Sequence, residues 1–424
     1  MKITLVHGKY FNSWEALGLG YIGAYVGRHM PEAEIDFYQG CFDDDETVIA
    51  GASNSDIVAF SCNTPTFPYA ERISARLKGI NPLIRTVVGG YHPSAIPQNC
   101  LVPSIDQVVV GEGEAAMLEI AQGNTGHIVN GRIMSFDELP WPNRTLIKNE
   151  RNIGVAYKDN AKRITSFQSH RACPFMCKFC LDGFNKVLFR TPEGNFPQKA
   201  PVRYRPVSNL LDEMEDVTER LELDLIKFCD PTWNTHIKWV TEFCQEKIRR
   251  GFKTPFYPNM HATMCTEEMI QLMARANCYE IAIGIESGSP KILKQIGKGT
   301  NRKTIRQCVS WAKNAGIIVR GYFILGMPDE NEEDLRMTEE FAEELEMDEY
   351  GFTILCPYPG TQMYDPSTAT SIDWATADEY SNDFWRTNHL TNAELKAWQA
   401  RLTAKFAEKL TWHNKQLENK KPDC

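Results

Sequence analysis

The chain has 424 residues, of which 42% are hydrophobic and 24% charged, so it is long enough for two or three domains with cores of their own. Lysine and arginine total 46 against 55 for aspartate and glutamate, and the net charge of -9 argues against a surface that coats a polyanion. No apolar stretch approaches the roughly 18 residues that span a bilayer, and the first apolar run is too short for a secretory signal. We therefore expect a soluble, cytoplasmic protein with no membrane span and no evident nucleic-acid partner.

Residues 1–145 alternate short apolar runs with longer amphipathic stretches, from KITLVH to QVVVGEGEAAMLEI. This βαβ rhythm predicts a Rossmann-like, doubly wound parallel sheet. The loops SCNTPTFP and GGYHPSAIP directly follow predicted strands, at the carboxyl edge where open α/β sheets bind ligands. The proline-containing stretch SFDELPWPNRTLI predicts the end of this domain, and residues 146–164 are expected to be a linker.

Strand-like and helix-like segments alternate again over residues 165–365, in LIKFCD, HIKWVTEFCQEKIRR, EIAIGIES, TNRKTIRQCVSWAKNAG and IVRGYFILG. This α/β alternation predicts a partial (β/α)6 barrel of the TIM type. Residues 366–424 lack strands and predict a small helical C-terminal region, whose long helix covers TNAELKAWQARLTAKFAEKLTWHNKQ behind an N-cap at Thr391.

The thirteen cysteines are an odd number and most lie singly, which favours a reducing environment. Cys173, Cys177 and Cys180 instead share the spacing C-x3-C-x2-C, close enough for their sulfurs to serve one metal centre. A disulfide would leave one thiol over, and a structural zinc site would need a fourth ligand, such as His170 or a remote cysteine. A cubane of four irons would leave one iron without a protein ligand, open to a substrate or cofactor.

The segment CPFMCKFC, with Phe179 before its last cysteine, resembles the signature of the radical S-adenosylmethionine (SAM) enzymes. The resemblance implies that Cys173, Cys177 and Cys180 hold a 4Fe-4S cluster and that SAM chelates its fourth iron. It further implies that one electron from the cluster cleaves SAM to a 5'-deoxyadenosyl radical, which abstracts hydrogen from an unactivated carbon.

Four later segments, KFCDPTWN, AIGIESGS, YFILGMPDE and PYPGT, resemble segments of the same family in the same order. With the cysteines they extend the resemblance over about residues 165–365. No catalytic residue beyond the cluster ligands is assigned. The resemblance implies that SAM is bound by Phe179, Asp230, Glu286, Ser287, Gly326, Pro328 and Tyr358.

Two features depart from the family pattern. His261 stands in NMHATM where relatives often carry an arginine, which leaves open the group that binds the cofactor carboxylate, because an isolated histidine is more often structural. Between Leu181 and Val202 the loop is longer than usual, and it is either a functional cover of the barrel mouth or a solvated excursion.

A second motif, Gly18-Leu19-Gly20-Tyr21-Ile22-Gly23, matches the dinucleotide fingerprint G-x-G-x-x-G. In that fingerprint the glycines form the turn directly after the first strand. Here the stretch GKYFNSWEAL separates the predicted strand from Gly18, so a nicotinamide site is disfavoured.

The segments LGLGYIGAYVGRH, DIVAFSCNTPTF, TVVGGYHPSAIP and VVVGEGEAAM resemble, in order, the cobalamin (B12)-binding domain that precedes the barrel in one branch of the radical SAM enzymes. Glycines suit the close approach of a bulky corrin, and tight strand-to-helix turns are the alternative explanation for them. The cobalt-ligating motif D-x-H-x-x-G is absent, which implies binding without histidine coordination. The implied cobalamin contacts are Gly18, Ser61, Cys62, Asn63, Thr64, Gly89, Gly90, His92, Gly111, Glu112 and Gly113.

These resemblances favour a cobalamin-dependent radical SAM methyltransferase acting on an unactivated carbon or phosphorus centre. The alternatives are a radical cyclisation, ring contraction or other rearrangement, with or without cobalamin, and a zinc-stabilised binding protein. Transfer RNA methylthiolation is disfavoured because the N-terminal half lacks a second cysteine trio. The expected partners are a reductant such as flavodoxin or ferredoxin and a small-molecule or peptide substrate.

Overall fold

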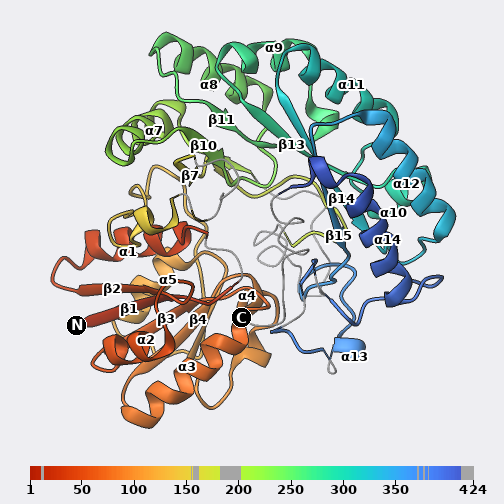
Figure 1. The fold of residues 1–424 in the computed structure, drawn as a ribbon. Coiled ribbons are helices and arrows are strands. Elements are labelled where there is room, and N and C mark those ends of the chain that lie inside the picture. The colour runs from red at the N-terminus through yellow and green to blue at the C-terminus, as the bar shows by residue number, and fades with distance from the viewer. Residues whose placement is uncertain are drawn as a thin grey trace. The chain divides into compact units, whose positions relative to one another are not determined.

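The computed structural model describes residues 1–10, 14–153, 155, 162–181, 202–369, 372–375, 378–380 and 382–411. The chain folds into two compact units. The first unit comprises residues 1–156, 181–203 and 358–376, and the second comprises residues 157–180, 204–357 and 377–424 (Figure 1). The expected division at residues 145, 164 and 365 stays a prediction.

The first unit is built on one parallel sheet with the strand order β2-β1-β3-β4-β5-β6. The order changes direction between β1 and β3, which makes that point the switch at which doubly wound folds bind ligands. The strands are β1 (Lys2–His7), β2 (Glu34–Gln39), β3 (Ile57–Ser61), β4 (Arg85–Gly89), β5 (Gln107–Val110) and β6 (Ile128–Asn130). The helices are α1 (Leu17–His29), α2 (Asp45–Ala52), α3 (Phe67–Ile80), α4 (Tyr91–Ala95), α5 (Gly113–Ala121) and α13 (Pro366–Ala369), with short 3-10 turns at Pro97–Cys100 and Asn149–Asn152.

Both faces of this sheet are buried. Ile3 of β1 packs in one apolar cluster with Val26 of α1, whereas Val6 of β1 packs in another with Phe60 of β3 and Ile73 of α3. Successive side chains of a strand point to opposite faces, so a strand covered on both sides needs apolar residues at nearly every position. The expected doubly wound domain is confirmed.

Part of the expected linker 146–164 packs on the first unit. Ile147 is 1% exposed and lies in the cluster that covers α1. A Cβ atom at Gly23 would lie 2.2 Å from Leu146 Cδ2, so this glycine of α1 is needed for close packing. Leu146 and Ile147 are therefore part of the core of the first unit. The proline-containing composition had predicted that the chain leaves the first domain near this position.

The second unit contains two parallel sheets, with the orders β11-β10-β7 and β12-β13-β14-β15. Pro258 alone separates β11 from β12, and a bridge from Phe256 to Cys278 joins the two sheets, so the strands form one array with six positions. The expected partial barrel is confirmed. Its strands are β7 (Ile164–Phe167), β10 (Leu225–Phe228), β11 (Phe256–Tyr257), β12 (Asn259–Met260), β13 (Glu280–Glu286), β14 (Ile318–Leu325) and β15 (Glu349–Ile354), and the short strands β8 (His170–Arg171) and β9 (Arg203–Tyr204) stand apart.

Helices cover the outer side of these strands, as the upper part of Figure 1 shows. They are α7 (Val207–Leu221), α8 (Ile237–Arg249), α9 (Glu267–Arg275), α10 (Pro290–Ile296), α11 (Arg302–Asn314) and α12 (Glu332–Leu345), with 3-10 turns at Ala262–Met264 and Ala407–Lys409. Within the described residues, no helix has the length and apolar character needed to cross a bilayer.

The C-terminal helix α14 (Asn392–Lys405) begins where the sequence predicts. Thr391 and Glu394 form a capping box, in which each side chain satisfies a backbone N–H at the helix start. Gln399 donates from Nε2 to the carbonyl of Phe352 at 3.0 Å, which attaches α14 to β15. The helix ends earlier than the apolar pattern predicts, and residues 412–424 lie outside the described residues.

Candidate functional site

The cysteine loop follows β7, the first strand of the barrel, at its carboxyl end. Cys173 and Cys177 are buried, and the Cys180 N–H donates to the Cys177 carbonyl at 3.1 Å. Cys173 Sγ lies 3.4 Å from Thr232 Oγ1, in the segment that follows β10. Because the barrel strands are parallel, the loop lies at the edge where such barrels carry their active sites.

The three thiols suit a cluster better than a single ion. Among the described residues, no three His, Cys, Asp or Glu side chains are arranged to hold one metal ion, as structural zinc requires. His170, one of the two groups considered as a fourth zinc ligand, lies with Nδ1 at 3.4 Å from Asp230 Oδ1. In a 4Fe-4S cluster each cysteine binds a different iron, so the sulfurs need not converge on one point. The donor chemistry of this loop fits such a cluster.

Asp230, predicted to contact SAM, anchors the cysteine loop. Its side chain is 1% exposed and accepts hydrogen bonds from the Ser169 N–H at 2.9 Å, the Ser169 hydroxyl at 2.8 Å and the His170 N–H at 2.9 Å. Burial raises the pKa of Asp230 even though these donors lower it. Both carboxylate oxygens of Asp230 therefore hold the start of the cysteine loop, and a SAM contact at this residue stays a prediction.

Two further contacts attach the cysteine loop to later segments of the barrel, at His261 and at Ile296. The Phe175 ring stacks on His261 with 3.8 Å between centroids and 7° between planes. The Lys178 N–H donates to the Ile296 carbonyl at 3.0 Å, at the end of α10. His261 is buried, and burial lowers the pKa of its imidazole to about 4, so it is neutral near pH 7. His261 therefore supports the loop, and a neutral imidazole offers a carboxylate no charge.

Glu286 pairs with a lysine that the sequence pattern did not single out. Lys298 Nζ lies 2.6 Å from Glu286 Oε1 and 2.7 Å from the Gly284 carbonyl. Burial lowers the pKa of Lys298, but Glu286 and then the thiolates of Cys177 and Cys180 outweigh it, so the pKa is raised overall. The only local signal for Lys298 is its place between Gly297 and Gly299, both of positive φ.

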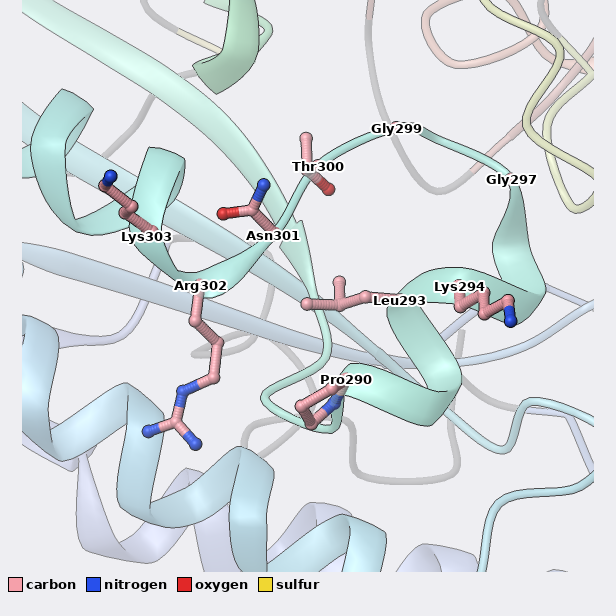
Figure 2. A pocket seen from close by; sticks show the side chains of 9 residues that line it. All are labelled: Pro290, Leu293, Lys294, Gly297, Gly299, Thr300, Asn301, Arg302 and Lys303. Carbon is pink, nitrogen blue, oxygen red and sulfur yellow. The ribbon is translucent and has the colours of Figure 1, made fainter.

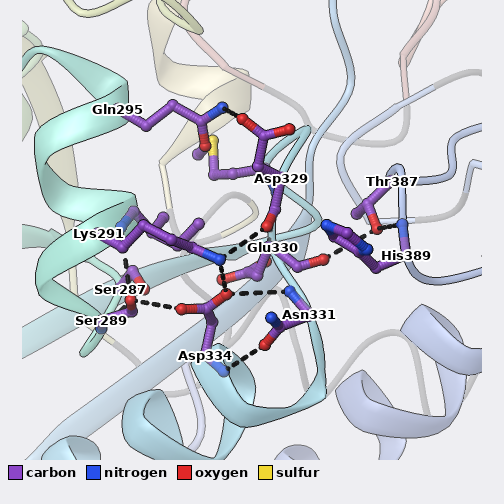
Figure 3. Close-up of polar contacts among 12 residues, drawn as sticks. Ser287, Ser289, Lys291, Gln295, Asp329, Glu330, Asn331, Asp334, Thr387 and His389 are labelled. Carbon is purple, nitrogen blue, oxygen red and sulfur yellow. Dashed lines mark hydrogen bonds and ion pairs between the residues drawn. The ribbon is translucent and has the colours of Figure 1, made fainter.

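Ser287, also predicted to contact SAM, is fully buried. Its hydroxyl lies 3.0 Å from Thr338 Oγ1 and accepts the Ser289 N–H at 3.1 Å. Figure 3 shows the neighbouring contact of Ser289 with Asp334, which joins the turn after β13 to α12. The Ser287 hydroxyl thus has two protein partners, and its SAM contact stays a prediction.

Residues of the C-terminal region form hydrogen bonds with the turn Gly326–Glu330 after β14. Trp385 Nε1 donates to the Gly326 carbonyl at 2.6 Å, and the Asn388 N–H donates to the Pro328 carbonyl at 2.8 Å. Gly326 has φ of +90°, which favours glycine at this position. Gly326 and Pro328 thus lie at the barrel edge that holds the cysteine loop.

Glu330 ends this turn as a fully buried acid. Its carboxylate accepts the Gly326 and Met327 N–H groups, and its backbone carbonyl accepts the Thr387 hydroxyl at 2.9 Å (Figure 3). Burial raises the pKa of Glu330 to about 8, so the group is mostly protonated at pH 7. The turn is therefore held by a neutral acid and by the segment before α14.

Phe179 and Tyr358 are the two remaining residues predicted to bind SAM, and their contacts stay predictions. Phe179 is half-buried in the cysteine loop. Tyr358 belongs to the first unit, where its carbonyl accepts the Thr361 N–H at 3.1 Å and the Thr361 hydroxyl at 2.9 Å. Residues 182–201, which contain nearly all of the long loop noted in the sequence, lie outside the described residues.

An open cavity of roughly 660 Å³ lies between α10 and the start of α11. Figure 2 shows Lys294 and Lys303 extending away from each other at its two ends. Arg302 is engaged by Glu344 at 3.0 Å. Cations that diverge do not form an anion site, so this cavity adds nothing to the chemistry of the cysteine loop.

In the first unit, the predicted cobalamin residues gather at the carboxyl edge of the sheet, in the loops after β3, β4 and β5. The Cys62 N–H donates to the Gly89 carbonyl at 2.7 Å, and His92 Nδ1 lies 3.2 Å from Thr64 Oγ1. Burial lowers the pKa of His92 to about 4, so its ring is neutral. Ser61 and Asn63 remain half-buried at the same edge.

His7, which the sequence pattern did not indicate, ends β1 at the switch point of the sheet. Its Nδ1 atom is buried and has no hydrogen-bond partner among the described residues. Burial lowers the pKa of His7 to about 4. Buried polar atoms in folded proteins are nearly always satisfied, so an orphan at a ligand-binding edge fits a site that holds a polar cofactor.

Two of the predicted glycines have a structural role. A Cβ at Gly90 would lie 2.4 Å from the Cys62 carbonyl oxygen, and a Cβ at Gly113 would lie 2.7 Å from Ile22 Cδ1. Both glycines therefore allow close packing of the protein itself, and their contacts to cobalamin stay a prediction. Gly89 and Gly111 lie at the same edge, and Gly111 has φ of +90°.

Glu112 and Gly18 were also predicted to contact cobalamin, and these contacts stay predictions. The Glu112 carboxylate is buried, accepts the Met134 N–H at 3.1 Å and pairs with Arg203. Gly18 is exposed and lies inside α1, as do the other glycines of the G-x-G-x-x-G match. That motif is therefore not the strand-to-helix turn of a nicotinamide site.

Comparison with protein families agrees with both sites. The model of the radical SAM superfamily matches residues 167–342, and the model of the B12 binding domain matches residues 3–121. The chain belongs to the radical SAM enzymes that carry a B12-binding domain. Its cofactors are accordingly a 4Fe-4S cluster, SAM and cobalamin, as the sequence resemblance implied.

This B12-binding radical SAM enzyme is 26% identical over 382 residues to the uncharacterized methyltransferase PH0819 of Pyrococcus horikoshii, covering 84% of this chain and 79% of that protein. It is 24% identical to the anaerobic magnesium-protoporphyrin IX monomethyl ester cyclase of Rubrivivax gelatinosus, covering 86% and 69%. Its fold is similar to the radical SAM methyltransferase TsrM of Kitasatospora setae, solved with cobalamin and a 4Fe-4S cluster, with a TM-score of 0.72 and 17% identity over 97% of this chain and 92% of that one.

Proposed function

We propose that this B12-binding radical SAM enzyme is a methyltransferase acting on an unactivated carbon or phosphorus centre. The observation that carries the proposal is the likeness to the uncharacterized methyltransferase PH0819 over 84% of the chain, which spans both cofactor domains. The fold likeness to TsrM, a methyltransferase solved with cobalamin and a 4Fe-4S cluster, supports it.

In this proposal Cys173, Cys177 and Cys180 hold the cluster, and Asp230 and His261 keep their loop in shape. Lys298 and Glu286 lie beside that loop and offer an ammonium and a carboxylate to the two charged ends of the amino-acid part of SAM. The turn from Gly326 to Glu330 offers backbone groups to the nucleoside. When bound, cluster and SAM supply one-electron cleavage of the sulfonium, and cobalamin supplies methyl-transfer chemistry.

The loops at residues 61–64, 89–92 and 111–113 form the proposed cobalamin edge, with His7 at the switch point. The neutral rings of His7 and His92 can each donate and accept a hydrogen bond, which suits contacts to the polar groups of a bound cofactor. The buried carboxylate of Glu112 acts here by holding Arg203 and the backbone at Met134 in place.

A radical cyclisation or rearrangement is the second candidate, because the cyclase of Rubrivivax gelatinosus is similar over 86% of the chain. The two chemistries differ in what happens to SAM. Methyl transfer consumes the SAM methyl group and leaves S-adenosylhomocysteine, whereas a rearrangement leaves 5'-deoxyadenosine and methionine alone. Product analysis with methyl-labelled SAM therefore separates them.

The proposal includes an electron donor such as flavodoxin or ferredoxin, because a radical SAM enzyme needs a low-potential electron. It also includes a cytoplasmic location. The substrate is proposed to be a small molecule or a peptide.

The test is anaerobic purification, reconstitution with iron, sulfide and hydroxocobalamin, and removal of unbound material before metal analysis. We expect about four irons and stoichiometric cobalt per chain. Incubation with methyl-labelled SAM and a reductant should then transfer label to the bound cobalamin. Iron without cobalt would favour the rearrangement, and zinc without iron would refute the enzyme assignment.

A further inference from the structure

Lys298 is a buried lysine in a position built for its ammonium group. The residue is 9% exposed, and Nζ donates to the Gly284 carbonyl at 2.7 Å and to Glu286 Oε1 at 2.6 Å. A Cβ at Gly284 would lie 2.3 Å from Nζ and 2.2 Å from Glu286 Oε1. Strand β13 therefore has a glycine where any side chain would displace the ion pair.

The same lysine is linked to the cysteine loop through its own backbone. Its carbonyl lies 3.1 Å from His261 Nε2, and the His261 ring stacks on Phe175, between Cys173 and Cys177. Two residues before Lys298, the Ile296 carbonyl accepts the N–H of Lys178. Glu286 and then the thiolates of Cys177 and Cys180 keep the pKa of Lys298 above its usual value. Lys298 is thus a buried positive charge in the segment that contacts the cysteine loop.

A fixed positive charge has a direct consequence for a cluster. Reduction adds one negative charge, and net charge and burial are among the factors that set the potential of an iron–sulfur centre. In a buried, low-dielectric site the attraction between opposite charges is much stronger than in water. We propose that the positive charge of Lys298 raises the reduction potential of the cluster on Cys173, Cys177 and Cys180. The opposite charge of Glu286 limits the size of this effect.

This inference rests on the cluster assignment of the proposed function and is independent of methyl transfer. It goes beyond a contact to SAM, because it concerns the enzyme before SAM binds. The experiment is therefore an anaerobic redox titration of the SAM-free, reconstituted enzyme, followed by the electron paramagnetic resonance signal of the reduced cluster.

For Lys298→Met we expect the ratio of reduced to oxidised cluster at a fixed potential to fall about tenfold, which for one electron is a shift of about 59 mV to more negative potential. Lys298→Arg keeps the charge and should restore most of the signal. The exposed Lys294, on α10 of the same segment, supplies the matched control Lys294→Met, which should titrate like the wild type. Glu286→Gln removes the opposing charge and should shift the potential the other way.

An unchanged potential in Lys298→Met, with loss only of SAM affinity, would overturn the inference and leave Lys298 as a cofactor ligand. If Lys298→Met does not fold, the sign of the shift in Glu286→Gln decides, and a shift to more negative potential overturns the inference. A wild-type enzyme that assembles no cluster would instead refute the cluster assignment in the proposed function.

Discussion

The Asp230 carboxylate holds the start of the cysteine loop. It accepts three hydrogen bonds from Ser169 and His170, and buried donors left without a partner cost about 1–3 kcal/mol each. We expect Asp230→Ala to lower the iron retained after reconstitution several-fold while the far-ultraviolet circular dichroism stays native.

The exposed Asp216 on α7 provides the control Asp216→Ala, for which iron content should not change. A variant Asp230→Ala with full iron content and weaker SAM binding would instead support the cofactor contact that the sequence resemblance implied.

Glu330 predicts a pH dependence of stability. Its folded-state pKa is about 8, well above the usual value for glutamate, so the folded state binds more protons than the unfolded state between about pH 5 and pH 8. The free energy of unfolding should therefore fall as pH rises through this window, by up to about 1.4 kcal/mol per pH unit. Glu330→Gln cannot ionise and should lack this fall, which urea denaturation at several pH values measures.

The neighbouring Glu332 is exposed, so Glu332→Gln should keep the wild-type profile. Identical pH profiles for Glu330→Gln and the wild type would show that Glu330 is ionised in the folded protein.

At the scale of elements, the loops after β3 and β4 depend on Gly90. This residue has φ of 111° and ψ of -166°, a conformation almost confined to glycine. We expect Gly90→Ala to lower the unfolding free energy of the first unit by more than the about 1–3 kcal/mol of backbone strain, because the new Cβ would also contact the Cys62 backbone. Denaturation of the cofactor-free protein measures this loss.

Gly123 also has positive φ, of +106°, but no atom lies within 4 Å of the place that a Cβ would take there. Gly123→Ala therefore reports backbone strain without a clash and should cost less. Equal losses for the two variants would mean that the packing of the β3 and β4 loops does not depend on Gly90.

At the scale of the whole molecule, two units with separate cores predict two unfolding transitions. Cobalamin binds the folded first unit, so free ligand at 100 times its dissociation constant should stabilise that unit by about 2.7 kcal/mol. Differential scanning calorimetry of the cluster-free protein, with and without hydroxocobalamin, should show one transition move and the other stay. A single transition that moves as a whole would contradict independent unfolding.

The sequence by itself determined the α/β class, the doubly wound domain, the barrel, the cysteine loop and the start of α14. These features depend on short-range patterns, namely apolar periodicity, cysteine spacing and the Thr391 cap, which are complete within a few residues of chain. The family followed from the same motifs, because they occur in a fixed order along the chain.

Only the tertiary structure decided which partners these polar groups have. Asp230, Ser287 and Glu112 match their motifs, and in the fold each is buried and contacts a residue distant in sequence. Lys298 matched no motif, yet the fold brings its ammonium to Glu286. Motif matching records residue type and order, whereas the partners of a side chain depend on burial and on long-range contacts that exist only once the chain has folded.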